Sequence, residues 1–326
     1  MNRLRRLVDQ ARQCTWLYLS LGTLAAALAT PFAYVTNQGD HSVSAIDLQR
    51  GESTATIVLG GGPAGVAVSR DGQQVFISDP QSAQIFRLDG ATQRVTAQRR
   101  TGKGPLGIAL SPDARHVYVA DWFADVVHVL DASTLAPLHE IAVGRAPSGV
   151  AVSPDGTTVF VADRDDDKVS VIDVASASVT HRVATGQRPF GLAVDPQGRR
   201  LYVANVASND VSVIDLKTLQ SLTTVAVGST PYGVAVAPDG SRVYVSNQHD
   251  NSVSLIDSAS LRVEAQPEVG EFPEGIVADP SGERVYVASW FSNELLVLDS
   301  RNLEVIQRLP TGDGPRAFGV FVAGGS

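Results

Sequence analysis

The segment PYGVAVAPDGSRVYVSNQ, residues Pro231–Gln248, has the pattern of a complete β-hairpin, and the fold follows from it. Val234 and Val236 alternate with small residues, which is the two-residue period of a strand. The segment Ala237–Gly240 is typical of a tight turn, because proline presets φ, aspartate bonds back to the backbone and glycine accepts positive φ. The segment Val243–Val245 combines β-branched and aromatic residues, so it predicts the returning strand.

This hairpin recurs with a period of 42 residues, and no insertion interrupts the period. Three markers repeat: an aromatic residue in the returning strand, a proline that opens the unit, and an aspartate that ends a later strand. The aromatic markers are Tyr34, Phe76, Tyr118, Phe160, Tyr202, Tyr244 and Tyr286. The prolines are Pro63, Pro105, Pro147, Pro189, Pro231, Pro273 and Pro315. The aspartates are Asp47, Asp89, Asp131, Asp173, Asp215, Asp257 and Asp299.

Each unit contains four strand-like runs, which we name strands A, B, C and D in chain order. Strand A follows the proline, strand B carries the aromatic residue, strand C ends at the aspartate, and strand D follows. In the fourth unit, strands C and D are Val169–Asp173 and Val179–Val183. Seven units of four short antiparallel strands, without a helical period, predict an all-β fold, a seven-bladed β-propeller.

The two ends of the repeat array complement each other. Strand B of the first unit, at Ala33–Val35, has no strand A before it, whereas Ala317–Val322 is a spare strand A after the last unit. We therefore expect the C-terminal strand to complete the blade that the N-terminal strands begin. Such a closed ring covers two sheet edges that would otherwise be unpaired.

Three of the returning strands resemble the signature of the YVTN-type β-propeller repeat family. They are Tyr34–Asn37 (YVTN), Tyr202–Asn205 (YVAN) and Tyr244–Asn247 (YVSN), and the flanking PxGVAVSPDG and SVSVID segments are similar too. The resemblance covers nearly the whole chain after residue 29 and implies a propeller. It leaves the function open, because this family includes surface-layer, periplasmic and cofactor-binding members.

Residues 1–29 differ in composition from the repeats. They begin with four arginines against one aspartate, continue with the uncharged run Trp16–Ala29, and end in Ala27–Ala29, which fits a small-x-small cleavage site. We expect residues 1–29 to be a cleaved signal peptide and residues 30–326 to be one propeller domain, periplasmic or secreted, with no stable membrane insertion. An uncleaved anchor is the alternative.

Sulfur and charge narrow the chemistry of residues 30–326. The single cysteine is Cys14, so this part of the chain has no disulfide, thiolate metal ligand, cysteine-linked haem or cysteine nucleophile. Removal of residues 1–29 changes the net charge from −8 to −11. This charge disfavours non-specific binding to nucleic acid or anionic lipid, and we expect a monomer.

The loops predict where a ligand binds. In a propeller, the D–A and B–C loops share one face, and here they vary between units, whereas the A–B turns hardly vary. We expect a small molecule, a peptide or a protein at this face, and no cofactor. The candidate ligand-binding residues are Trp122, Phe123, Arg188, Phe190, Tyr232, Trp290, Phe291 and Arg316.

The candidates carry two kinds of chemistry. The pairs Trp122–Phe123 and Trp290–Phe291 occupy the same B–C position in units three and seven and would stack on a flat ligand, a sugar or a peptide. Alternatively, each pair packs on neighbouring loops. Arg188 and Arg316 flank opening prolines and would suit a carboxylate or phosphate, unless they are solvated loop charges.

The acidic run in unit four is a weak candidate metal site. It contains Asp163, Asp165 and Asp167 but lacks the spaced ligands of a dedicated calcium loop. Asp163 and Asp167 also match positions that are Asn or Asp in most units, so capping of the B–C turn is the favoured interpretation. The sequence contains neither a Ser/His/Asp arrangement nor an H-E-x-x-H motif.

We therefore predict a non-enzymatic binding or scaffold protein that uses the face of the D–A and B–C loops. Three alternatives stay open. A lactonase- or lyase-type propeller enzyme would use Arg188, Glu274 and Arg316. The resemblance also permits an accessory protein of a periplasmic quinone or haem oxidation system, and a binder of single-stranded DNA, although the charge counts against the last.

Overall fold

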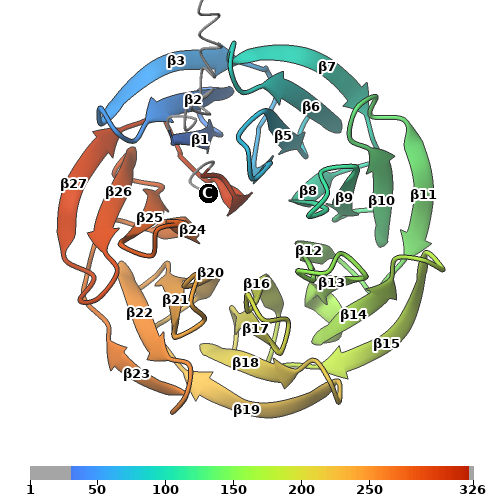
Figure 1. Ribbon diagram of the computed structural model, residues 1–326, viewed down its shortest axis with the longest axis vertical. Coiled ribbons are helices and arrows are strands. Elements are labelled where there is room, and N and C mark those ends of the chain that lie inside the picture. Colours follow the sequence, from blue (N-terminus) through green and yellow to red (C-terminus); the bar gives the residue numbers. More distant parts are fainter. Residues whose placement is uncertain (1–30, 323–326) are drawn as a thin grey trace, which may run out of the picture.

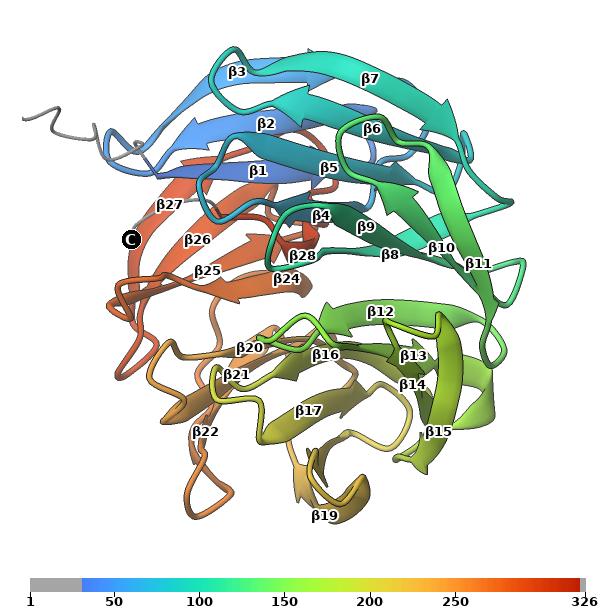
Figure 2. The same ribbon diagram turned by 45° about the vertical axis from the view of Figure 1, so that its right-hand side comes forward.

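The computed structural model describes residues 31–322, which form a ring of seven sheets around a central channel (Figure 1). We number these sheets blades one to seven in chain order. Each complete blade runs from strand A at the channel to strand D at the rim, and the oblique view shows the D strands wrapped around the outside (Figure 2). The predicted seven-bladed propeller is confirmed.

The innermost strands, A, are β4 (Gly65–Val68), β8 (Pro105–Leu110), β12 (Pro147–Val152), β16 (Pro189–Val194), β20 (Pro231–Val236) and β24 (Pro273–Ala278). Strands B are β1 (Phe32–Asn37), β5 (Gln74–Asp79), β9 (His116–Asp121), β13 (Thr158–Asp163), β17 (Arg200–Asn205), β21 (Arg242–Asn247) and β25 (Arg284–Ser289).

Strands C are β2 (Ser42–Asp47), β6 (Gln84–Asp89), β10 (Val126–Asp131), β14 (Lys168–Asp173), β18 (Asp210–Asp215), β22 (Ser252–Asp257) and β26 (Glu294–Asp299). Strands D are β3 (Glu52–Val58), β7 (Arg94–Arg100), β11 (Pro137–Ala142), β15 (Ser178–Ala184), β19 (Gln220–Ala226), β23 (Arg262–Ala265) and β27 (Val305–Pro310). A short 3-10 helix, η1 (Arg164–Asp166), lies in one B–C loop, and β28 (Phe318–Val320) ends the described chain.

The hairpin of blade six shows how the repeat folds. Val234 pairs with Val245 and Val236 with Val243. The turn between them is held by a backbone hydrogen bond of 2.8 Å from the Gly240 N–H to the Ala237 carbonyl, and Gly240 has a φ of +76°. The residues proposed for the turn therefore make it for the expected reason, since glycine tolerates this φ at little cost.

The hydrophobic core lies between neighbouring blades. The cluster between blades five and six, for example, joins Tyr202 and Val211 to Val243 and Ile256. The recurring aromatic residues of strands B are fully buried, and the Tyr244 hydroxyl donates a hydrogen bond of 2.9 Å to the carbonyl of Ser300 in the next blade. The 42-residue period therefore places one large ring in each gap between blades.

The C-terminal segment closes the ring beside β1. Asn37 forms a bridge with Pro315 and Ala33 with Val322, and the Arg316 N–H donates to the Thr36 carbonyl at 2.8 Å. Between these bridges, however, β28 leaves β1 and pairs in parallel with β4 of blade two.

The physical reason is segment length. From Pro315 to Val322 the closing segment takes two more residue steps than Pro147 to Val152 takes in blade four, against the same stretch of strand B. The extra length bulges away from β1, with Gly319 at a φ of +122°. Closure by the C-terminal strand is confirmed, and its middle part also joins the neighbouring blade.

Within residues 31–322, no helix has the length and apolar character that a membrane crossing requires. Residues 1–29, the predicted signal peptide, lie outside the described residues.

Candidate functional site

The D–A and B–C loops form one continuous face, which we call the loop face. Backbone hydrogen bonds join the two loops in six of the seven blades, as from the Trp122 N–H to the Gly104 carbonyl at 2.9 Å and from the Trp290 N–H to the Phe272 carbonyl at 3.0 Å. In blade two, where Pro80 has no N–H to donate, the Gly62 N–H instead donates to the Asp79 carboxylate at 3.0 Å. Loops of neighbouring blades are joined as well, because the Arg188 N–H donates to the Asp167 carboxylate at 2.8 Å. The face is therefore a hydrogen-bonded surface rather than a set of independent loops.

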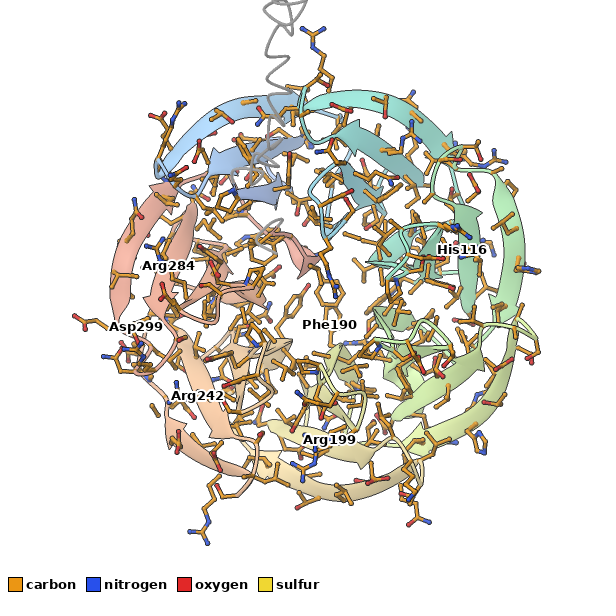
Figure 3. The ribbon with its side chains drawn as sticks, in the orientation of Figure 1. His116, Phe190, Arg199, Arg242, Arg284 and Asp299 are labelled. Atoms are coloured by element: carbon orange, nitrogen blue, oxygen red, sulfur yellow. The ribbon has the colours of Figure 1, made fainter. Side chains whose placement is uncertain are left out.

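Three aromatic side chains fill the channel just below this face, and we call Phe190, Tyr232 and Phe318 the aromatic floor. The ring centroid of Phe190 lies 4.4 Å from that of Tyr232 and 5.0 Å from that of Phe318. Phe190 and Tyr232 are only 7% and 5% exposed, and Figure 3 shows Phe190 reaching the centre of the ring. Both residues are candidate ligand-binding residues from the sequence, and in the structure they pack together under the face.

In the two Trp–Phe pairs, the tryptophan and the phenylalanine differ in their packing. The Arg164 guanidinium lies 5.2 Å from the Trp122 ring centroid, and the Arg316 guanidinium lies 4.9 Å from the Trp290 centroid. In each pair the tryptophan is partly buried under an arginine that follows it around the ring, which matches the packing alternative of the sequence analysis.

The phenylalanines of the same pairs point the other way. Phe123 and Phe291 are 64% and 63% exposed. Phe291 also continues a row of rings, since its centroid lies 5.1 Å from that of Phe272, which lies 5.5 Å from that of His249. The loop face thus presents two apolar projections, one in blade three and one in blade seven.

An ion pair between buried Glu274 and partly buried Arg316 lies beside the aromatic floor. Arg316 Nε donates to Glu274 Oε2 at 2.8 Å, and Gln248 Nε2 donates to Glu274 Oε1 at 2.9 Å. Burial raises the pKa of Glu274, although the charge of Arg316 opposes this shift. The Tyr232 hydroxyl is buried nearby and has no hydrogen-bond partner among residues 31–322, and burial raises its pKa as well.

Arg188, the third residue proposed for a lactonase-type site, is exposed and has a φ of +54°. The structure therefore brings Glu274 and Arg316 into direct contact and leaves Arg188 at the surface.

The acidic run of blade four is engaged in local bonds. Buried Asp163 accepts hydrogen bonds from the Gly144 N–H at 3.0 Å and the Ser170 hydroxyl at 2.6 Å. Burial raises the pKa of Asp163 to about 6. Asp165 pairs with Arg164 at 2.7 Å. Among the described residues, no group of three or more His, Cys, Asp or Glu side chains is arranged to hold a metal ion.

One polar cluster in blade three escaped the sequence analysis. His128 Nε2 lies 3.2 Å from Asp121 Oδ2, and His128 Nδ1 lies 3.5 Å from Glu140 Oε2. The equivalent of His128 in blade four is Ser170, which bonds the equivalent carboxylate, Asp163. A position-by-position comparison of the units would have shown this exchange of serine for histidine.

The fold and the loop face define a β-propeller of seven blades whose ring is closed at the C-terminus. The chain belongs to the YNCE-like beta-propeller family, whose model matches residues 23–111 and 193–284, more than half of the chain. A second model, the seven-bladed beta-propeller lactonase, matches residues 127–233. No curated protein sequence matches the chain.

Solved structures share the fold at low sequence identity. Hydrazine synthase from Kuenenia stuttgartiensis is 24% identical, with a TM-score of 0.71 over 78% of this chain and 88% of that chain. A functionally unknown protein from Desulfotomaculum acetoxidans DSM 771 is 17% identical, with a TM-score of 0.73 over 88% and 99%. The dihydro-heme d1 dehydrogenase NirN, in complex with DHE, is 20% identical, with a TM-score of 0.64 over 87% and 74%. Identities this low support the fold and carry no function to this chain.

Proposed function

We propose that this protein is a non-enzymatic binding or scaffold protein whose loop face holds a peptide or protein segment. One observation carries the proposal: Phe123 and Phe291 stand 64% and 63% exposed at matching positions of blades three and seven. Exposed large apolar side chains on one face are typical of interaction sites. Because the aromatic floor fills the channel beneath them, the partner lies across the face rather than entering the ring.

The rest of the face supports an extended partner. Trp122 and Trp290 are held in place by arginines, so a partner meets an ordered surface and little ordering entropy is lost on binding. Arg188 and Lys103 are exposed on the same face and favour acidic groups on the partner. The net charge of −11 for residues 30–326 disfavours nucleic acid as the partner.

The setting follows from residues 1–29. We propose that this segment directs export and is removed, so that a monomeric propeller acts in the periplasm or outside the cell. The chain belongs to the YNCE-like family, and the assignment of its repeats to the YVTN type remains a prediction.

The experiment uses peptides selected from a displayed random library on the leaderless chain 30–326. In this chain Trp122 and Trp290 are the only tryptophans, so a change in tryptophan emission reports binding near the loop face. Replacing both Phe123 and Phe291 by alanine should weaken the selected peptides roughly thirtyfold, about 2 kcal/mol.

The matched control replaces two apolar residues of similar exposure on the outer strands. Leu222 and Ile306 are 50% and 53% exposed on β19 and β27. The double alanine variant L222A/I306A should bind the peptides like the parent protein. Equal binding by F123A/F291A and the parent would remove the basis of the proposal.

A lactonase-type enzyme is the second candidate, because the lactonase model matches residues 127–233 and because Glu274, Arg316 and Tyr232 meet at the channel. The carboxylate and the guanidinium are bonded to each other, which makes a resting ion pair the simpler role. Hydrolysis of aliphatic lactones is monitored through the protons that it releases. Activity of the parent protein that is lost in the E274Q variant would support the enzyme. Absence of hydrolysis by the parent protein would eliminate this candidate.

A further inference from the structure

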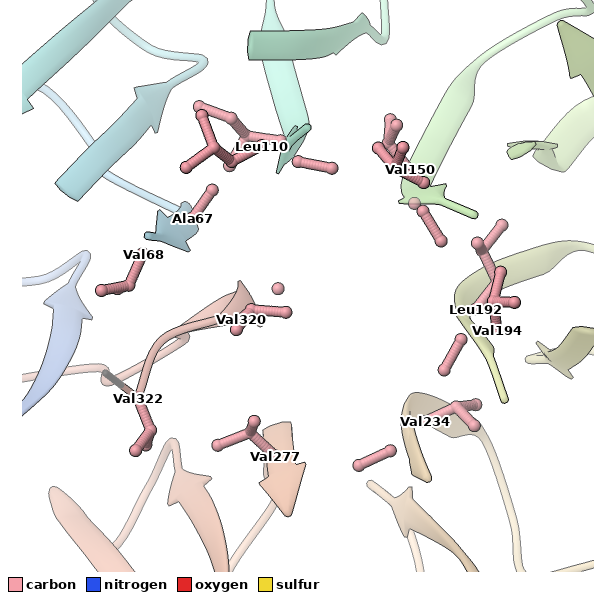
Figure 4. Close-up of a pocket in the computed structure, with 18 of the residues that line it drawn as sticks. Ala67, Val68, Leu110, Val150, Leu192, Val194, Val234, Val277, Val320 and Val322 are labelled. Atoms are coloured by element: carbon pink, nitrogen blue, oxygen red, sulfur yellow. The ribbon is translucent and has the colours of Figure 1, made fainter. Parts of the chain in front are cut away.

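The middle of the ring contains a cavity of about 510 Å³, separate from the loop face. Its lining comes from strands A of blades two to seven and from the closing segment around β28. Figure 4 shows their side chains surrounding an open centre. A volume of this size is within the usual range for a site that holds one small molecule.

The side chains that face this cavity are mainly apolar. Leu110, Val150, Leu192 and Val277 line it and remain partly exposed, although they lie at the centre of the molecule. Val320 is 55% exposed at the bulge of the closing segment. Exposure of apolar surface to water is unfavourable, so the binding of an apolar molecule that covers this surface is favourable.

The cavity is closed at one end and open at the other. Phe318 belongs both to its lining and to the aromatic floor, so the floor blocks the end near the loop face. The opposite end reaches the A–B turns at Pro112, Pro154 and Pro280. Along blade four, the strand part of the lining, from Gly149 to Val152, spans about 10 Å at the rise of an extended strand, and Pro154 of the following turn continues it. The cavity is therefore a channel with an aromatic end and an open end, which can receive a linear chain from the open end.

A single charged residue marks the open end. Arg70 is the only residue with a charged side chain among those that line the cavity, and it is exposed. Five other units carry proline at this position: Pro112, Pro154, Pro196, Pro238 and Pro280. The neighbouring Asp71 carboxylate already accepts hydrogen bonds from Ser69 and Gln73. Within the lining, the mouth therefore offers one guanidinium beside an uncharged channel, whereas the aspartates of the A–B turns, such as Asp113 and Asp155, lie outside the lining.

We propose that the channel binds one long-chain fatty acid, with its hydrocarbon chain along strands A and its carboxylate at Arg70. The apolar channel fits the chain, and the guanidinium fits the head group. This site lies on the opposite side of the aromatic floor from the loop face, so it is independent of the function proposed above.

Calorimetric titration of the purified protein with octanoate, decanoate, dodecanoate and 1-dodecanol tests the site. Each added methylene should tighten binding about fourfold, so dodecanoate should bind roughly sixteenfold more tightly than decanoate. The R70Q variant should bind dodecanoate about fivefold more weakly and 1-dodecanol unchanged. The control R115Q removes an exposed arginine of another A–B turn, with a side chain 80% exposed, and should leave both affinities unchanged.

A bulky residue placed in the channel gives a second, independent test. L192W should abolish binding of dodecanoate, whereas L222W on the outer strand β19 should not. Absence of dodecanoate binding by the parent protein, absence of chain-length dependence, or equal binding by L192W with an unchanged thermal midpoint would overturn the proposal. If L192W does not fold, the chain-length series and R70Q decide the question.

Discussion

The loop face and the opposite face, which carries the A–B turns and which we call the turn face, end the same channel in opposite ways. At the loop face, Phe190, Tyr232 and Phe318 pack into a floor, and Phe123 and Phe291 project above it. At the turn face, nearly uniform A–B turns surround an open apolar channel. In this repeat protein, distinct surfaces arise where the units depart from their common pattern.

The largest effect on stability should come from truncating the aromatic floor, which separates the two faces. Phe190 is 7% exposed and contacts three other aromatic rings, so F190A should lower the free energy of unfolding by about 3–5 kcal/mol. Denaturant unfolding measures this loss. F123A, which removes an exposed ring, should change stability by less than about 0.5 kcal/mol. Similar losses for the two variants would show that the floor is not packed as described.

The second largest effect is a pH dependence of stability that comes from Asp163 in blade four. Burial raises the pKa of Asp163 to about 6 in the folded protein, above its value in the unfolded chain. The folded state therefore binds the proton more tightly, and stability declines as the pH rises from about 4 to 6. D163N, which places here the residue found at Asn205 and Asn247, should gain about 2 kcal/mol at pH 8 and nothing at pH 4.

The control is Asp131, a carboxylate whose pKa is shifted in the opposite direction. Hydrogen bonds from Ser133 and Thr134 lower the pKa of the partly exposed Asp131 to about 2. Its stabilising contribution is therefore present at neutral pH and is lost as the pH falls from about 4 to 2. D131N should show no gain at pH 8, and a gain equal to that of D163N would indicate a general effect of net charge.

The smallest effect compares the matching carboxylates of blades three and four. Burial favours the neutral form of Asp121, yet the hydrogen bond from His128 and backbone N–H groups hold the pKa of Asp121 below its ordinary value. H128S gives blade three the serine of blade four and should raise this pKa, as carboxyl-carbon NMR would show. An unchanged Asp121 titration would mean that the backbone bonds alone set it.

The sequence predicts the framework well because the framework is local and repeated. The turn at Ala237–Gly240, the buried aromatic residue of each strand B and the closing segment all follow from short-range residue chemistry and a fixed period. Seven copies of one pattern leave little freedom in how the blades are arranged.

The site is less predictable because it depends on contacts across the ring. Phe190 and Tyr232 meet only because strands A of neighbouring blades converge at the channel. The separation of the two residues along the sequence does not reveal how close their rings lie. The Arg316–Glu274 pair likewise joins residues 42 positions apart from different units. The parallel pairing of β28 with β4 arises from two extra residues whose path the repeat does not define.

Hydrogen–deuterium exchange, measured with and without a selected peptide, locates the partner-binding surface. We expect protection in the B–C loops 122–125 and 290–293 and none in the A–B turns around the channel mouth. Protection at those turns, or none at either B–C loop, would contradict the assignment of partner binding to the loop face.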